Sequence, residues 1–468
     1  MKKIIVVGGG TAGLISALIL KQTFDCNIQI IKSDKIGIIG VGEGSTEHWS
    51  EFLRYCHIDW KELIQKTDAT LKYGIRFTRW TEKEYFHHID DYAAIKYGSH
   101  IYSYFKDYSE DNDAVVSTDW NHLENLVHNE EHCVANQFHF NTFKLNEFLL
   151  NKCKERDIEI IDDEINFVGV ADKGITSIVG TKEYRADFYI DCTGMKRLLI
   201  SKLGAKWKSY KDHLFMNEAI AFPTGDTDEY TPYTEARKMN AGWLWRIPTY
   251  GRWGNGYVYN NNKINSDEAI EELKKEYNVD TINIGKHVKF EPGALDKTWI
   301  KNCVAVGLAA NFVEPLEASS IGTTIQQNFL FCNYLLDPFN SQEFNNKMDE
   351  IMENIRDFVL VHYLNDQDFK PTDSLRDKLV IWSKRPPLPN DFQNDRLLFT
   401  EMNWVNILCG LKFFKHDIIS NFIKMYNTQN RLIIEKAMAD NKLNKYNKLN
   451  YISHKKWLEK IRTPMQKT

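Results

Sequence analysis

The sequence predicts an α/β fold in which a Rossmann-type domain is combined with an inserted β-sheet layer and a helical carboxy-terminal part. Three observations lead to this class: a glycine-rich turn between an apolar strand and a helix near the amino terminus, a stretch rich in aromatic and β-forming residues at 214–260, and helical periodicity beyond Ile321. With 468 residues, 43% hydrophobic and 26% charged, the chain has a globular composition and the length of about two or three domains.

The amino-terminal segment is expected to form a βαβ unit. Residues 4–7 (IIVV) and 28–31 (IQII) are short apolar runs of the kind found in buried parallel strands, and Leu14 to Leu20 is the helix between them. Further helical stretches are expected around 47–66 and 142–156.

The middle of the chain is expected to be mostly strand. We predict β-structure over 158–193, with a turn at Asp172–Gly174, and a sheet layer over 214–260. Residues 266–277 (SDEAIEELKKEY) predict an amphipathic helix capped by its serine. Residues 302–308 (NCVAVGL) predict another buried strand.

Bulk properties exclude several classes of protein. The net charge of −5 indicates no basic face for nucleic acid, and no apolar run reaches the about 18 residues of a membrane-spanning helix. Glycines within residues 8–13 interrupt the first apolar stretch, which argues against a signal peptide. None of the eight cysteines stands in a CxxC pair, so we expect reduced, buried thiols in a cytoplasmic protein and no metal site.

The glycine-rich turn reads Gly8-Gly9-Gly10-Thr11-Ala12-Gly13 and fits the G-x-G-x-x-G fingerprint of dinucleotide binding. Gly8 permits the tight turn, Gly10 lets the backbone approach the pyrophosphate, and Gly13 lets the helix pack closely on the strand. The amino terminus of the helix then faces the negative charge. The alternative is a glycine-rich turn with a structural role alone.

The end of the second strand departs from the common dinucleotide-binding pattern. An acidic residue is usual there, about 20 residues after the glycines, where it binds the ribose. This chain has Lys32, followed by Ser33-Asp34. Two interpretations stay open: Asp34 takes the role of the acid, or the site binds its cofactor more weakly without one.

Two later segments favour FAD over NAD. Residues 187–194 (DFYIDCTG) end a strand in Asp-x-x-Gly, and residues 302–311 are a strand followed by a turn of small residues. Flavin-binding hydroxylases usually carry Gly-Asp-Ala in that turn, where this chain has Gly307-Leu308-Ala309. No second G-x-G-x-x-G follows a strand, so reducing equivalents are expected from outside the chain.

Residues 242–248 (GWLWRIP) contain two tryptophans at alternate positions. On a strand, Trp243 and Trp245 share one face, and Pro248 is expected to end that strand. Taken alone, the pattern is more typical of two packing tryptophans than of a site.

Three more segments change that balance: residues 40–44 (GVGEG), 69–77 (ATLKYGIRF) and 312–322 (FVEPLEASSIG). Together with the fingerprint and the Trp-x-Trp-x-Ile-Pro strand, they resemble the flavin-dependent halogenases of the tryptophan halogenase group. The resemblance runs in order from Met1 to about Gly322, with weaker echoes at 360–363 and 403–404.

The resemblance implies that reduced FAD, oxygen and a halide ion yield hypohalous acid, which crosses a tunnel and halogenates an electron-rich aromatic compound of indole or phenol type. The resemblance also implies that Trp243 and Trp245 form a barrier between flavin and substrate. It implies that Lys72 binds the hypohalous acid or forms a haloamine. Glu317 is expected to deprotonate the ring or polarise the acid. Without the resemblance, Lys72 would be taken for a solvated lysine at a strand edge and Glu317 for a surface or helix-cap carboxylate.

The halide is expected at a helix amino terminus, where Ser319 and Ser320 fall at the family's halide-binding position. Tryptophan-specific members read Glu-Ser-Thr-Gly-Ile, whereas this chain reads Glu-Ala-Ser-Ser-Ile. The altered loop leaves chloride, bromide and iodide open as the preferred halide.

By the same resemblance, FAD contacts are expected from the glycine loop, the second strand and the later turns, at Gly8, Gly10, Thr11, Ala12, Gly13, Ser33, Ile36, Val41, Gly44, Leu308 and Ile321. Residues 1–330 are expected to form the FAD-binding and halogenation module, with the inserted sheet at about 205–300, and residues 331–468 a helical substrate-side region. A separate flavin reductase is the expected partner.

The substrate pocket is less well defined than the cofactor site. Candidate aromatic residues are Phe86, His87, His88, Trp404 and Phe413, although each is more typical of packing or surface. Two alternative functions stay open beside halogenation: a flavin-dependent aromatic hydroxylase and a non-catalytic flavoprotein. The hydroxylase predicts the Gly-Asp flavin motif and no lysine and tryptophan set, and the sequence has the opposite.

Overall fold

The computed structural model describes residues 2–38, 40, 44–88, 137–336, 340–415, 417–418, 421, 424–425 and 453–463. The chain forms two compact units. Unit 1 comprises Met1–Ala69, Phe140–Leu214 and Glu291–Arg356, and unit 2 comprises Thr70–His139, Phe215–Phe290 and Asp357–Thr468. Most of the inserted sheet and the helical tail therefore share one unit, while the division by function at residue 330 stays a prediction.

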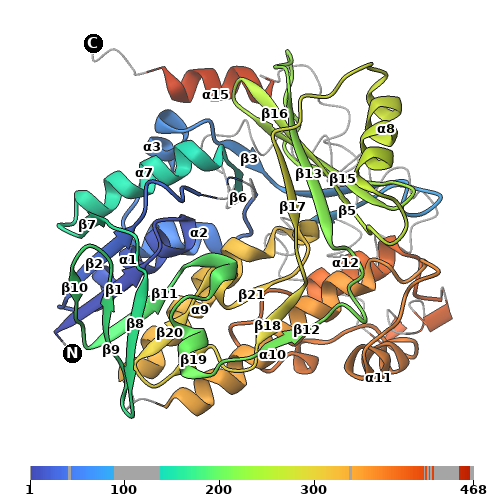
Figure 1. Cartoon of the computed structure of the whole chain (residues 1–468). Helices are drawn as coiled ribbons and strands as arrows, with labels where there is room; N and C mark the ends of the chain where they lie inside the picture. Colours follow the sequence, from blue (N-terminus) through green and yellow to red (C-terminus); the bar gives the residue numbers. More distant parts are fainter. Residues whose placement is uncertain are drawn as a thin grey trace. The chain divides into compact units, whose positions relative to one another are not determined.

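Unit 1 is built on a sheet with the strand order β19-β20-β11-β1-β2-β7 (Figure 1). Its neighbouring strands are parallel except for the antiparallel pair β19–β20. The strands are β1 (Lys3–Val7), β2 (Asn27–Lys32), β7 (Glu159–Asp162), β11 (Phe188–Asp191), β19 (Trp299–Ile300) and β20 (Cys303–Ala305). Helix α1 (Thr11–Thr23) connects β1 to β2, so the predicted βαβ unit is present.

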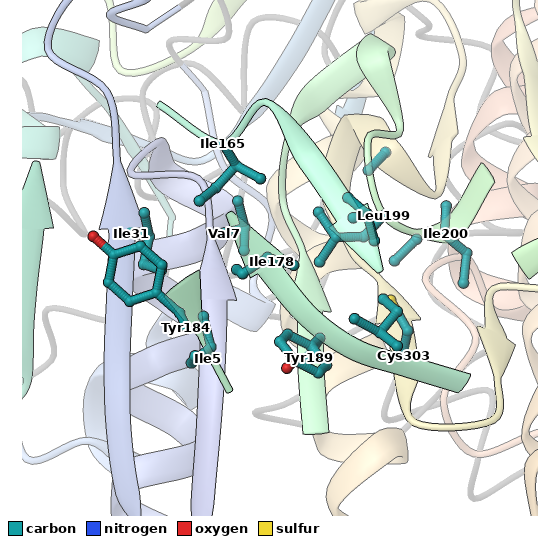
Figure 2. Close-up of a cluster of buried hydrophobic side chains, with 14 of the residues drawn as sticks. Ile5, Val7, Ile31, Ile165, Ile178, Tyr184, Tyr189, Leu199, Ile200 and Cys303 are labelled. Atoms are coloured by element: carbon teal, nitrogen blue, oxygen red, sulfur yellow. The ribbon is translucent and has the colours of Figure 1, made fainter. Parts of the chain in front are cut away.

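The core of unit 1 explains why these strands are continuous apolar runs. Ile4, Ile5 and Val6 of β1 are fully buried, as expected for a parallel strand covered on both faces. Figure 2 shows part of this core, where Ile5 and Tyr189 of the sheet gather with Ile178 and Tyr184 of a small antiparallel sheet. That sheet consists of β8 (Phe167–Ala171), β9 (Gly174–Val179) and β10 (Glu183–Tyr184), and β8 and β9 enclose the predicted turn.

Helices and a second small sheet complete unit 1. Helix α1 packs against α7 and α9, and α2 packs against α9. The helices are α2 (His48–Tyr55), α3 (Trp60–Lys66), α7 (Thr142–Lys154), α9 (Ser319–Leu336) and α10 (Ser341–Val361), the last of which continues into unit 2. The small sheet contains β12 (Trp207–Ser209), β18 (Gly293–Leu295) and β21 (Asn311–Phe312).

Unit 2 contains a sheet with the order β17-β13-β16-β15-β14-β4-β5. All its pairs are antiparallel except β14–β4. The strands are β4 (Gly74–Thr78), β5 (Tyr85–His88), β13 (Glu218–Thr224), β14 (Thr234–Lys238), β15 (Gly242–Thr249), β16 (Arg252–Tyr259) and β17 (Lys286–Lys289). A separate two-stranded ribbon pairs β3 (Thr70–Lys72) with β6 (Gln137–His139).

The predicted helix at 266–277 is present as α8 (Ser266–Tyr277), but its predicted cap is wrong. Asn265 is the N-cap: its side-chain oxygen accepts from the backbone N–H groups of Asp267 and Glu268, and the Glu268 carboxylate accepts from the Asn265 N–H. This reciprocal capping box leaves Ser266 as the first helical residue. Ala269 and Leu273 point into the core of unit 2.

The carboxy-terminal helices of unit 2 are α11 (Asp373–Trp382), α12 (Glu401–Gly410) and α15 (His454–Arg462), and the Pro-rich segment at 386–389 follows α11. Among the described helices, none has the length and apolar character to span a bilayer, and no described cluster of His, Cys, Asp or Glu has the arrangement of a metal site. Within the described ranges, seven cysteines are free of disulfides, and all except Cys192 are buried.

Two sequence-based strand boundaries need correction. The strand predicted over 302–308 ends at Ala305, after which Gly307–Ala309 forms the 3₁₀ helix η3. Pro248 does not end its strand, because β15 continues to Thr249 and pairs with β16 along its whole length.

Candidate active site

The fingerprint loop of unit 1 requires glycine at two positions. Gly8 has φ +123°, and a Cβ atom there would lie 2.2 Å from the carbonyl oxygen of Cys192. A Cβ atom on Gly13 would lie 2.0 Å from the carbonyl oxygen of Gly8. The loop therefore packs directly on the end of β11 and on the first turn of α1, with no room for a side chain on either side.

Gly10 occupies a different environment. It is the N-cap of α1, with φ −76° and ψ 176°, and no described atom lies within 4 Å of the position of a Cβ atom. The first N–H groups of α1 have no intrahelical acceptor, so they and the helix dipole face this open side. A dinucleotide pyrophosphate fits this cradle, because the phosphate needs both close backbone approach and N–H donors.

Helix α9 and the 3₁₀ helix η3 (Gly307–Ala309) pack against the start of α1. Gly307 has φ +66°, and its Cβ atom would lie 2.6 Å from the Cβ atom of Ala12. Asn328 of α9 donates to the Ser16 hydroxyl at 3.0 Å. The structure thus brings Leu308 on η3 into the neighbourhood of the fingerprint, and Ile321 lies in the first turn of α9.

Lys32 stands at the end of β2, against the fingerprint. A Cβ atom on Gly9 would lie 2.6 Å from the Lys32 Cβ atom, and the Lys32 ammonium forms an ion pair with the Asp34 carboxylate. The Asp34 side chain lies outside the core, since it is 68% exposed. The end of β2 therefore carries a lysine and aspartate pair where the common pattern has a single acid.

The other predicted FAD residues lie in different settings. Ser33 follows β2 directly and is partly exposed, Ile36 is 57% exposed, and Gly44 is buried. Val41 lies outside the described residues. Of this group, Ile36 is an apolar side chain that solvent reaches, as a contact residue for a bound ligand requires.

Asp191, in the predicted flavin motif 187–194, serves the protein backbone. Its carboxylate accepts hydrogen bonds from the N–H groups of Thr193, Leu199 and Ile200 at 2.8–3.0 Å. The residue is fully buried, and these bonds hold the segment after β11 in place. This motif therefore builds the floor beneath the glycine loop.

Glu317 and the two serines flank one sharp backbone turn. Glu317 ends the 3₁₀ helix η4 (Pro315–Glu317) and is fully buried, which excludes the surface-carboxylate interpretation. Ala318 follows in the left-handed region, with φ +52°, at a cost of about 1 kcal/mol for a non-glycine residue. Helix α9 then begins at Ser319, which is buried, and Ser320, which is exposed. A carboxylate and a helix amino terminus thus lie on adjacent residues.

Lys72 of unit 2 is also fully buried, which excludes the interpretation as a solvated strand-edge lysine. It ends β3, and the next strand starts at Gly74, where a Cβ atom would lie 2.2 Å from the His87 carbonyl oxygen. The register pairs Lys72 directly with Gln137 of β6.

A polar frame surrounds β3, and sequence reasoning missed most of it. The Thr70 hydroxyl donates to the Pro248 carbonyl at 2.7 Å, so it accepts from Nδ1–H of His139 at 3.1 Å. His139 Nε2 then accepts from the Thr234 hydroxyl at 3.0 Å. Burial, the Lys72 charge and His454 together hold the pKa of His139 well below its usual value, so its imidazole is neutral.

The carboxy-terminal helix also reaches this strand. His454, the first residue of α15, accepts a hydrogen bond through Nε2 from the backbone N–H of Leu71 at 3.2 Å. Lys455 forms an ion pair with Asp226 at 2.7 Å. No local pattern could have identified His139 or His454, because each is an isolated histidine whose partner is distant in the sequence.

The two tryptophans of β15 share a face, as predicted, and their ring centroids lie 6.1 Å apart. Trp243 is buried, whereas Trp245 is partly exposed and lies over Gly256, its partner on β16. A Cβ atom on Gly256 would lie 2.1 Å from the Trp245 ring. The hydrogen bond from Thr70 to Pro248 ties this strand to the lysine strand within unit 2.

Two of the candidate pocket aromatics are packing residues. His87 is buried and its Nε2 lies 3.2 Å from the Asn403 amide, and Trp404 is buried against Phe358 and Trp382. Phe86 and Phe413 are partly exposed. The side chain of His88 lies outside the described parts of the structure.

Comparison with known proteins gives a consistent answer. Residues 3–422 match the tryptophan halogenase family. A 7-chloro-L-tryptophan 6-halogenase of Kutzneria sp. is 29% identical over 445 residues, covering 82% of this chain and 85% of that protein. A tryptophan halogenase structure from Shewanella frigidimarina superposes with a TM-score of 0.88 at 25% identity, over 99% of this chain and 98% of that one. A flavin-dependent halogenase from Xanthomonas campestris gives a TM-score of 0.82 at 25% identity, over 98% of each chain.

The matched region covers most of the chain, including the fingerprint, β3 and the Trp-x-Trp-x-Ile-Pro strand. The chain therefore belongs to the tryptophan halogenase family and is a flavin-dependent halogenase. The resemblance drawn from the motifs is confirmed, and the α/β fold class is confirmed with it.

Proposed function

We propose that this halogenase uses reduced FAD, oxygen and a halide ion to halogenate a small electron-rich aromatic compound of indole or phenol type. When bound, FAD supplies the electrons that reduce oxygen, and the halide is oxidised to hypohalous acid. In the transfer step, the carbon–halogen bond forms as the oxygen–halogen bond breaks, the ring proton leaves, and the oxygen departs as water. The relatives named as tryptophan halogenases support an indole-type substrate.

The observation that carries the proposal is the setting of Lys72. Lys72 is fully buried on a short strand, and burying an ammonium group lowers the stability of the fold unless its charge is compensated. Lysine is almost never fully buried for packing alone, so this setting favours a functional role. Its strand is tied to the Trp-x-Trp-x-Ile-Pro strand through Thr70 and Pro248. Lys72 holds the hypohalous acid that arrives through a tunnel, and Trp243 and Trp245 keep the substrate from the flavin.

The remaining roles belong to unit 1. FAD is held by Gly8, Gly10, Thr11, Ala12, Gly13, Ser33, Ile36, Val41, Gly44, Leu308 and Ile321. The cradle at Gly10 and the close packing of Gly307 on Ala12 support this set. The start of α9 at Ser319 and Ser320 binds the halide, and Glu317 takes the ring proton. A separate flavin reductase supplies reduced FAD, and the protein works in the cytoplasm.

One assay tests the proposal. The protein is supplied with FAD, a flavin reductase, NADH, oxygen, each halide in turn and a panel of indoles and phenols, and products are identified by mass spectrometry. A halogenated product that disappears in Lys72→Met, while reduced flavin is still oxidised, is the expected result. Oxygen incorporation without halogen would support a hydroxylase, and no product despite bound flavin would support a non-catalytic flavoprotein. Normal halogenation by Lys72→Met would refute the role of the lysine.

A further inference from the structure

Gln137 lies directly across the β3–β6 ribbon from Lys72. The register pairs Lys72 with Gln137, Leu71 with Phe138, and Thr70 with His139. Side chains directly opposite each other in an antiparallel pair share a face, with Cβ atoms about 4.5–5.5 Å apart. Because the Thr70 and His139 side chains hydrogen-bond to each other, Lys72 and Gln137 share that same polar face.

The Gln137 side chain is unusual for a buried amide. The residue is fully buried, yet neither its amide nitrogen nor its amide oxygen has a hydrogen-bond partner among the residues that the structure describes. Buried polar groups are nearly always hydrogen-bonded, and leaving one unsatisfied costs about 1–3 kcal/mol. An uncompensated donor and acceptor beside a buried lysine point to a polar ligand.

Among the described residues, the neighbouring polar groups of this face do not bond to Gln137. Thr70, His139 and Thr234 are committed to one another and to the Pro248 carbonyl, and both ring nitrogens of His139 are occupied. The neutral imidazole adds no competing charge beside Lys72. The described groups of the first half of this face therefore bond one another, and the second half carries Lys72 and the Gln137 amide, whose two polar atoms have no described partner.

We propose that Gln137 binds the hypohalous acid together with Lys72 and holds its oxygen in place while the halogen is transferred. This inference rests on the proposed function. Hypohalous acid has one O–H donor and an oxygen acceptor, which match the amide oxygen and amide N–H of Gln137. As the carbon–halogen bond forms and the oxygen–halogen bond breaks, the amide and the ammonium hold the departing oxygen, which gains one proton and leaves as water while the ring loses one proton.

Gln137→Met tests the inference, since methionine keeps the length of the side chain and removes both hydrogen-bonding groups. Halogenated product per reduced flavin oxidised is expected to fall about fivefold, as for one lost hydrogen bond, while hypohalous acid caught by a diffusible trap rises. Thermal unfolding is expected at the wild-type temperature or above it, because an unsatisfied buried amide has been removed. The control is Phe138→Leu, on the opposite face of the same strand, which lowers stability and leaves the yield per flavin oxidised unchanged.

The outcomes separate the possible failures. Wild-type yield per flavin in Gln137→Met would overturn the inference alone. A lower unfolding temperature in Gln137→Met would also overturn it, because the amide would then be hydrogen-bonded within the protein. No halogenated product from the wild-type protein, with any halide, would overturn the proposed function and this inference with it.

Discussion

The glycines of the fingerprint are expected to separate into one that serves the cofactor and one that serves the fold. Gly10→Ala places a methyl group where no described atom lies within 4 Å, whereas Gly13→Ala places it 2.0 Å from the Gly8 carbonyl oxygen. Real Cβ contacts are essentially never shorter than 3.0 Å, so Gly13→Ala requires the loop and helix to separate by about 1 Å. The two single-methyl changes, three residues apart, should therefore have opposite consequences.

The magnitudes follow from the two environments. Gly8 is held in place, because its N–H donates to the Ile31 carbonyl at 2.8 Å and a Cβ atom on it would lie 2.2 Å from the Cys192 carbonyl oxygen. Gly13→Ala is therefore expected to destabilise the protein by about 1–3 kcal/mol. Gly10 has φ −76° and ψ 176°, which alanine adopts without strain. Gly10→Ala should change the free energy of unfolding by no more than about 1 kcal/mol. Alanine is a slightly poorer N-cap residue than glycine, and this loss is offset because alanine lowers the conformational entropy of the unfolded chain.

Cofactor binding gives the contrasting readout. In Gly10→Ala the methyl group occupies the space through which the pyrophosphate approaches the backbone, and FAD affinity is expected to fall at least about tenfold, or 1.4 kcal/mol. The assays are urea unfolding without cofactor and FAD titration by fluorescence. Gly225→Ala, another glycine with no atom within 4 Å of the Cβ position, is the control and should change neither quantity. Wild-type FAD affinity in Gly10→Ala would refute this account of the cradle.

Two further predictions concern unit 2. The depressed pKa of His139 means that below about pH 6.5 the unfolded chain binds a proton that the folded chain does not. The free energy of unfolding therefore decreases as the pH is lowered, by up to about 1.4 kcal/mol per pH unit. Urea unfolding between pH 7.5 and 5.5, in steps of about half a unit, should show a smaller slope for His139→Gln, and an equal slope would contradict the neutral imidazole. A Cβ atom on Gly256 would lie 2.1 Å from the Trp245 ring, so Gly256→Ala should push that ring away by about 1 Å, with a shifted tryptophan emission and a lower yield of product per flavin oxidised. Unchanged emission and yield together would show that Trp245 does not depend on Gly256.

Local sequence patterns predicted those parts of the molecule whose cause is local. The βαβ unit and α8 follow from apolar runs and helical periodicity, and the fingerprint follows from glycines needed within one turn. The cap of α8 was misplaced because Asn265 and Ser266 are both good capping residues. Asn265 wins because Glu268 stands three residues after it and completes the capping box.

The environment of the lysine could not be predicted in the same way. Lys72 was identified from its motif, but Gln137 and His139 come from β6, and His454 comes from the far end of the chain. A three-residue strand has too little pattern to be recognised, and its pairing is decided by tertiary contacts. The same limit applies to Asp191, whose place in a motif suggested the cofactor although its carboxylate binds the backbone.

The proline of the Trp-x-Trp-x-Ile-Pro strand has a structural reason that joins the tryptophans to the lysine. Strand β14 pairs with β15 only as far as Arg246, while β16 continues to pair with it through Thr249. Beyond Arg246 no described strand pairs with that side of β15, so a proline there removes no described ladder hydrogen bond from the sheet. The Pro248 carbonyl on that side accepts from the Thr70 hydroxyl, two residues before Lys72. The position where the Trp-x-Trp-x-Ile-Pro strand loses the neighbour β14 is thus the position where its backbone carbonyl binds the strand that carries Lys72, so this hydrogen bond fixes the two strands to each other.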